Sequence, residues 1–243
     1  MCGRRVSAAA SVAAAFVIVA SCASAGPIEV ADSARFIFFS GLDLWREGNF
    51  AHGGLLWSPG GVDQEGFTLK TLISGGTYRY TSGALGNARV TGTETVGQFL
   101  PGWRFKSGTL ELKVFAGLDL EEHHLSPDDP SSGLHGHDTG VRGAFDLWYE
   151  PVPRMMVAAD GSLSSIVGTY SARGALGWRA FDFAYIGPEV QTYACDGYRQ
   201  IRFGVHLTGF KTGQFEWSLA AGWARDSDAH TGAYGRIGEM MRR

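Results

Sequence analysis

The chain is poor in cysteine and in long apolar runs, and each shortage excludes a class of protein. Only three cysteines occur in 243 residues, and Cys2 and Cys22 both lie near the start. Cys195 alone remains further along the chain, so a disulfide framework is excluded. No apolar run after residue 25 approaches the roughly 20 residues that a membrane-spanning helix needs, which disfavours a helical membrane protein.

Charge is also scarce, whereas glycine and aromatic residues are abundant. Charged residues make up 19% of the chain and the formal net charge is −3. Basic residues form no run or stripe, so nucleic-acid binding has no electrostatic support. Glycine occurs 35 times, and each glycine inside a helix costs about 1 kcal/mol relative to alanine. The composition therefore disfavours a helical bundle.

The first 25 residues have the parts of a secretory signal peptide. Arg4 and Arg5 form a positive start, an apolar segment runs over 6–20, and Ala23-Ser24-Ala25 forms an A-x-A cleavage site. Residues up to Cys22 also resemble a lipobox, which would leave that cysteine as a lipidated N-terminus. We favour ordinary cleavage, because the serine before the cysteine is a weak choice for a lipobox.

Cleavage divides the sequence into a signal peptide, residues 1–25, and a single domain, residues 26–243. Within that domain, apolar and polar side chains alternate. From Leu110 to Leu120 every second residue is apolar, and most residues between them are polar or glycine. A strand turns successive side chains to opposite faces, so this alternation predicts strands. We expect about twelve of them, near residues 36–45, 49–58, 65–80, 91–106, 109–122, 138–150, 154–163, 169–179, 181–193, 197–208, 214–225 and 231–238.

Two all-β architectures fit this pattern. A soluble β-sandwich buries its apolar face between two sheets, whereas a transmembrane outer-membrane β-barrel turns that face to lipid and keeps a polar lumen. Aromatic residues near the strand ends fit the interfacial girdles of a barrel. Longer connections over 81–90, 123–137 and 226–230 alternate with mostly short turns, as in barrels. We predict the antiparallel barrel and keep the soluble β-sandwich as the alternative.

If the apolar face meets lipid, the opposite face carries charged side chains into the lumen. These charges either pair with one another, which avoids unpaired burial, or form a selectivity lining for a polar solute. We favour the structural pairing. The candidate lumen-lining residues are Arg104, Glu111, Lys113, Asp119, Arg202 and Glu216.

The segment 123–138 holds four histidines and several acids, which are the residue types that ligate metals or perform acid–base chemistry. Metal sites need ligands at fixed geometry, and a flexible loop does not supply it. We interpret the segment as a solvated outer loop with tight turns, and keep adventitious metal binding as the lesser alternative. The sequence has no hydrolase elbow, phosphate loop or zinc-protease motif. We therefore expect a protein that is not an enzyme and has no cofactor or metal.

Several short motifs follow one another along the chain. They are Phe38-Phe39-Ser40-Gly41, Gly53-Gly54-Leu55-Leu56-Trp57-Ser58-Pro59, Asp63-Gln64-Glu65-Gly66-Phe67, the loop Leu125-Ser126-Pro127-Asp128-Asp129-Pro130, and the run Gly187-Pro188-Glu189. In this order they resemble the cellulose biosynthesis protein BcsS family of outer-membrane proteins. The end of the chain, Met240-Met241-Arg242-Arg243, departs from the terminal aromatic residue of many outer-membrane barrels.

The resemblance implies a Gram-negative outer-membrane barrel associated with cellulose synthesis or export, and it carries over no catalytic residue. It implies outer-membrane lipid, cellulose or another polysaccharide, and other components of cellulose synthesis as partners. Two other functions stay open. One is a general, porin-like channel for small solutes, and the other is an outer-membrane enzyme that modifies lipid A.

Overall fold

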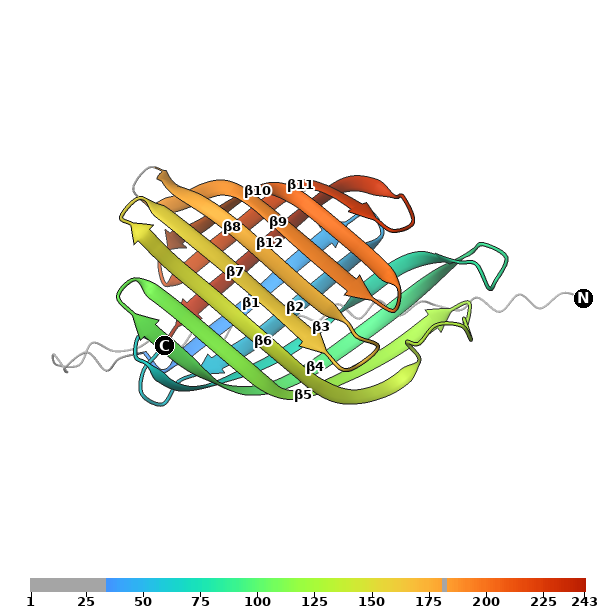
Figure 1. Ribbon diagram of the computed structural model, residues 1–243, viewed down its shortest axis with the longest axis horizontal. Helices are drawn as coiled ribbons and strands as arrows, with labels where there is room; N and C mark the ends of the chain where they lie inside the picture. Colours follow the sequence, from blue (N-terminus) through green and yellow to red (C-terminus); the bar gives the residue numbers. More distant parts are fainter. Residues whose placement is uncertain (1–33, 181–182) are drawn as a thin grey trace, which may run out of the picture. The chain divides into compact units, whose positions relative to one another are not determined.

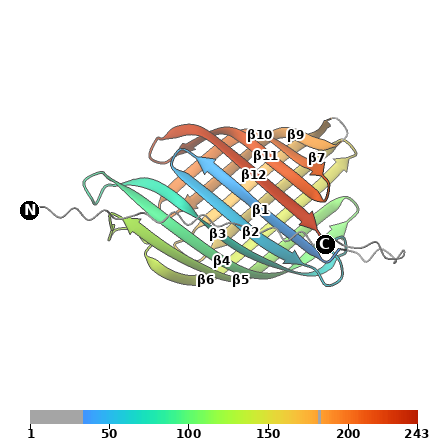
Figure 2. The same cartoon turned by 180° about the vertical axis from the view of Figure 1, so that it is seen from behind.

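The computed structural model describes residues 34–180 and 183–243, and these form a closed antiparallel β-barrel (Figures 1 and 2). Each strand pairs with the next along the chain, and the last pairs with the first. The strands are β1 (Phe36–Trp45), β2 (Gly48–Trp57), β3 (Gly66–Ser82), β4 (Ala88–Ser107), β5 (Leu110–Ser126), β6 (Gly136–Val152), β7 (Met155–Ser164), β8 (Tyr170–Ala180), β9 (Ala184–Cys195), β10 (Tyr198–Thr212), β11 (Phe215–Asp226) and β12 (Thr231–Arg242).

The expected barrel is therefore confirmed, with strands within a few residues of their expected positions. The closed strand order rules out the soluble β-sandwich. Across the two described stretches, no helix is long and apolar enough to cross a membrane. The expected signal peptide and Cys22 lie outside the described residues.

Alternation along each strand separates an outer face from an inner one. Large apolar side chains such as Leu118, Val141 and Phe203 are 52%, 63% and 59% exposed. Residues between them, such as Asp119 and Arg202, are buried. The apolar belt is the surface that a membrane barrel presents to lipid, while the polar set lies inside.

Strands β3 to β6 extend further than their neighbours. They have 17, 20, 17 and 17 residues, and their two hairpins project beyond the other strands (Figure 1). We call this end of the barrel the mouth; it carries the connections 83–87 and 127–135. The extension corrects the bounds of the loop expected at 123–138, because only 127–135 is a connection and its flanks belong to β5 and β6. His123 is a buried residue of β5, because the alternation of that strand continues past the expected end.

Pro101 and Pro188 lie in the interior of strands β4 and β9, where proline removes a ladder donor. At Pro188 the pairing of β8 with β9 is interrupted, and a Cβ on Gly187 would lie 2.0 Å from the carbonyl oxygen of Leu176. Pro101 interrupts the pairing of β4 with β5 in the same way, and a Cβ on Gly117 would lie 2.1 Å from the carbonyl oxygen of Phe99 and 3.0 Å from Pro101 Cδ. Only glycine permits such a close backbone approach, so each proline is accommodated beside a glycine.

Candidate functional site

A cavity of about 720 Å³ occupies the half of the barrel next to the mouth. Residues from the connections 127–135 and 196–197 line its upper part. A smaller cavity of about 380 Å³ lies in the other half. His52, Leu72 and Asp160 line both, so the two cavities adjoin in the middle of the barrel. The larger cavity lies within the size range of sites for small ligands.

Aromatic rings are prominent on the wall of the larger cavity. The rings of Tyr78 and Tyr80 are stacked, with centroids 6.3 Å apart and planes inclined by 20°. A Cβ on Gly92 would lie 2.2 Å from the Tyr78 ring, so the glycine leaves room for that ring against β4. Flat aromatic surfaces of this kind can pack against the apolar faces of a ligand. The aromatic residues of the wall are Trp45, Phe50, Tyr78, Tyr80, Tyr170, Tyr193 and Tyr198.

Acidic side chains outnumber arginines on the same wall. Arg202 is held by Asp43, whose two carboxylate oxygens lie 2.8 and 2.7 Å from Nη1. Glu47 and Asp160 are also paired, with Arg89 and Arg173, and the carboxylate oxygens that remain open can accept hydrogen bonds from hydroxyl groups. The acids are Asp43, Glu47, Glu94, Asp129, Asp160, Asp196 and Asp228, and the arginines are Arg79, Arg142 and Arg202.

A network of buried charges crosses the barrel near the place where the cavities adjoin. Glu189 accepts hydrogen bonds from Arg173 at 3.0 Å, Arg236 at 2.7 Å and Tyr234 at 3.0 Å. Arg173 also donates to Asp160 at 3.0 Å. The five residues come from four strands, β7, β8, β9 and β12, so the network links distant parts of the wall. Buried charges are tolerated because they are paired and hydrogen-bonded.

The six candidate lumen residues lie in separate parts of the barrel. Arg104, Glu111 and Lys113 lie together toward the end opposite the mouth. Lys113 binds Glu111 at 2.7 Å, and Arg104 lies 3.7 Å from the same carboxylate. Arg104 also donates to the carbonyl oxygen of Val62 in the connection after β2.

The other three candidates do not join that group. Asp119 pairs with Arg142 at 2.7 Å, whereas Arg202 pairs with Asp43 on the wall of the larger cavity. Glu216 is the most peripheral of the six, since its partner is the exposed Lys211 at 3.7 Å. The candidates therefore take part in several ion pairs and not in one constellation.

The motif residues singled out in the sequence also have distinct places. Leu125 and Ser126 end β5, whereas Gly187-Pro188-Glu189 lies within β9 at the interrupted pairing. The Asp129 side chain holds the connection 127–135 in place through hydrogen bonds. Its carboxylate accepts bonds from the hydroxyl of Ser131 at 2.6 Å and from the hydroxyl of Tyr80 at 3.0 Å.

The family model for cellulose biosynthesis protein BcsS matches residues 37–243. The chain belongs to this family. Membership confirms the resemblance carried by the sequence motifs, and it places the barrel among proteins named for cellulose biosynthesis. No curated protein matches the chain.

Solved outer-membrane proteins share the fold of this BcsS-family barrel. The COG4313 outer-membrane channel from Pseudomonas putida F1 superimposes with a TM-score of 0.56 at 10% identity, covering 91% of this chain and 100% of that one. The KdgM porin superimposes with a TM-score of 0.50 at 14% identity, covering 84% and 98%. At such low identities the similarity shows the barrel fold alone.

Acid is expected to loosen the connection 127–135. The bonds from Ser131 and Tyr80 lower the pKa of Asp129 from 3.8 to about 2. A lowered pKa stabilises the folded connection above pH 4, and this contribution is lost as the pH falls from about 4 to about 2. Asp129→Asn should loosen the same connection at neutral pH. Hydrogen exchange of residues 127–135 measures this effect.

The matched control for that variant is Asp128→Asn. The Asp128 side chain is 78% exposed and lies beside Asp129 in the same connection. Its replacement should leave exchange at neutral pH unchanged. Equal exchange rates in the Asp129→Asn variant and the unaltered barrel would show that this carboxylate does not hold the connection.

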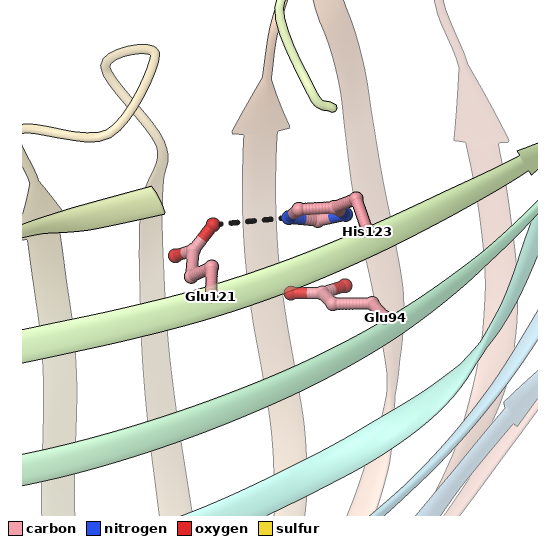
Figure 3. Close-up of side chains that lie close together, drawn as sticks. All are labelled: Glu94, Glu121 and His123. Carbon is pink, nitrogen blue, oxygen red and sulfur yellow. Dashed lines mark hydrogen bonds and ion pairs between the residues drawn. The ribbon is translucent and has the colours of Figure 1, made fainter. Parts of the chain in front are cut away.

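One cluster of side chains inside the barrel was not predicted from the sequence. Glu94, Glu121 and His123 each offer a ligand atom within 4.8 Å of the others, so they could hold a metal ion (Figure 3). The signal was present in the sequence, because Glu121 and His123 continue the inward phase of Asp119. The histidine-rich composition of the following residues suggested a loop and hid that continuation.

Proposed function

We propose that this barrel is a non-catalytic accessory of cellulose production at the outer membrane and that its larger cavity holds a segment of the polysaccharide. Family membership supports the link to cellulose. The observation that carries the proposal is the cavity of about 720 Å³, which aromatic rings and carboxylates line from several sides. Other components of cellulose synthesis are its proposed partners.

The wall suits a neutral β-linked glucan by its chemistry. Each glucose ring has two apolar faces of C–H groups and a rim of hydroxyl groups. The rings of Tyr78, Tyr80 and Trp45 can pack against the faces. Carboxylates such as Asp160 accept hydrogen bonds from the hydroxyls, and charged acceptors make the stronger bonds. The excess of acids does not repel a neutral polymer, but it opposes an anionic one.

The proposed location follows from the outer surface and from the start of the chain. The exposed apolar side chains of the wall form the surface that lipid would cover. Export would use residues 1–25 as a signal peptide that is cleaved after Ala25. With the start of β1 on the periplasmic side, the mouth, with its longer hairpins, faces the outside of the cell.

Deletion of the gene tests the proposal in a strain grown under cellulose-producing conditions. We expect a several-fold loss of secreted cellulose and recovery when the unaltered chain is supplied on a plasmid. The amount of the other cellulose-synthesis proteins is measured in the same cells as a control. Unchanged cellulose secretion in the deletion strain would overturn the proposal.

The adjoining cavities favour a general small-solute channel as the second candidate function. His52, Leu72 and Asp160 line both cavities, so a path through the barrel would pass between these side chains. Reconstitution in planar bilayers separates the two functions. A reproducible conductance that added cellohexaose does not reduce would favour the general channel. A silent barrel, or a conductance blocked by cellohexaose, would favour the polysaccharide function.

A further inference from the structure

Three metal-ligating side chains converge on the inner face of the paired strands β4 and β5. Glu94 lies directly opposite His123 in the register, and Glu121 precedes that histidine by two residues on the same face. Figure 3 shows the three side chains lying together on one side of the wall. One ligand atom from each lies within 4.8 Å of the other two. We propose that Glu94, Glu121 and His123 form a binding site for a divalent transition-metal cation such as zinc.

The buried negative charge around these three side chains favours a bound cation. The side chains of Glu121 and His123 are only 2% and 1% exposed. Arg142 forms an ion pair with Glu121 at 3.0 Å, but the same guanidinium also forms an ion pair with Asp119 at 2.7 Å. Among the residues that the structure describes, Glu94 has no hydrogen-bond or ion-pair partner. One arginine therefore faces three carboxylates, which leaves negative charge for a metal to neutralise.

Two carboxylate oxygens near the group have no hydrogen-bond partner, which is a second sign that a cation binds there. Asp119 is fully buried on the same face of β5, and its Oδ1 atom has no hydrogen-bond partner. Asp138 lies opposite Glu121 in the register of β5 with β6, and its buried Oδ2 atom also lacks one. Buried acceptors without donors are rare in native structures. A hydrated cation at Glu121 would supply the missing donors through its water molecules.

The histidine is already oriented as a metal ligand would be. Its Nδ1 atom lies 3.3 Å from the hydroxyl of Tyr78, and its Nε2 atom lies 3.2 Å from Glu121 Oε2. Metal-bound histidines commonly hold the second ring nitrogen against an oxygen, and Tyr78 fills that role here. Two ligands bound to zinc at about 2.0–2.1 Å in tetrahedral geometry lie roughly 3.3 Å apart. The Nε2 and Oε2 atoms are therefore at the separation that one ion requires.

The ligand types indicate which cation binds. Calcium and magnesium prefer sites made of oxygen alone, whereas one imidazole with two carboxylates suits zinc and its first-row neighbours. Three protein ligands leave a fourth position for water. Glu94 and Tyr78 also line the larger cavity, so the ion would lie in the cavity wall. The site does not depend on the polysaccharide function.

Titration of the purified, chelator-stripped barrel with zinc chloride in detergent tests the site. We expect one tightly bound zinc ion per chain by calorimetry and by elemental analysis after dialysis. Glu94→Gln should weaken this affinity at least about tenfold, because it removes a charged ligand. Glu94 makes no bond within the described structure, so this variant should fold. Heat-modifiable migration on a gel verifies folding.

His124→Gln is the matched control. His124 follows the proposed ligand directly but is 74% exposed on the outer face, where it lies 3.1 Å from Glu122. Its replacement removes surface chelation and should leave the tight site intact. Two results would overturn the proposal. One is the absence of stoichiometric zinc in the unaltered barrel, and the other is zinc binding that is lost with His124→Gln but kept with Glu94→Gln.

Discussion

Replacement of Glu189 by leucine is expected to destabilise the barrel by about 3–5 kcal/mol. The Glu189 carboxylate is buried and accepts bonds from Arg173, Arg236 and Tyr234. Its loss would leave two arginines whose donor atoms both lie within 3.0 Å of the same oxygen, and among the described residues only Asp160 is an acidic partner of either. Urea unfolding in lipid vesicles, followed by tryptophan fluorescence, measures the change in the free energy of unfolding.

Glu216→Leu provides the comparison for this first variant. Glu216 also carries a charge on the polar face, but its partner Lys211 is 71% exposed and lies 3.7 Å away. An exposed pair of this kind contributes no more than about 1 kcal/mol. Equal losses of stability in the two variants would mean that the network around Glu189 is no more important than a surface ion pair.

Gly187→Ala is expected to cost about 3 kcal/mol, at the upper end of the range for overpacking. The added Cβ would lie 2.0 Å from the carbonyl oxygen of Leu176, which is backbone and cannot rotate away. The same carbonyl accepts a bond from His206 Nε2 at 3.0 Å, so any shift of β8 also weakens that bond. The midpoint of urea unfolding should fall, while a folded barrel still forms.

Gly174→Ala in the adjacent strand β8 is the matched variant. A Cβ at this position would meet only Val190 Cγ1 at 3.9 Å, which is an ordinary contact. Its unfolding free energy should stay within about 0.5 kcal/mol of the unaltered barrel. A similar loss in both variants would show that alanine in these strands is costly for a reason other than the Leu176 contact.

The sequence was sufficient to predict the strands, because a barrel wall forces a period of two on every segment. Strand β11 (Phe215–Asp226) follows that period throughout and was predicted within one residue at each end. Prediction was weaker where composition and period disagreed. In β5 the alternation continues to His123, but the following histidines, prolines and aspartates are typical of a loop.

Contacts across the lumen could not be predicted from the sequence. Arg202 and Asp43 are separated by 159 positions, and Glu189 binds Arg236 from three strands away. Which inward side chains meet depends on how the strands tilt and stagger when the barrel closes. The sequence indicates which residues face inward but not which partner each one meets.

Titration of the purified barrel with cellohexaose decides whether the larger cavity binds a glucan. We expect saturable binding by the unaltered chain and at least about tenfold weaker binding by Trp45→Ala, a loss of about 1.4 kcal/mol. Trp223→Ala should bind normally, because Trp223 is 57% exposed on the outer face. No binding by the folded, unaltered barrel, or equal weakening in both variants, would contradict the assignment of the larger cavity to the polysaccharide.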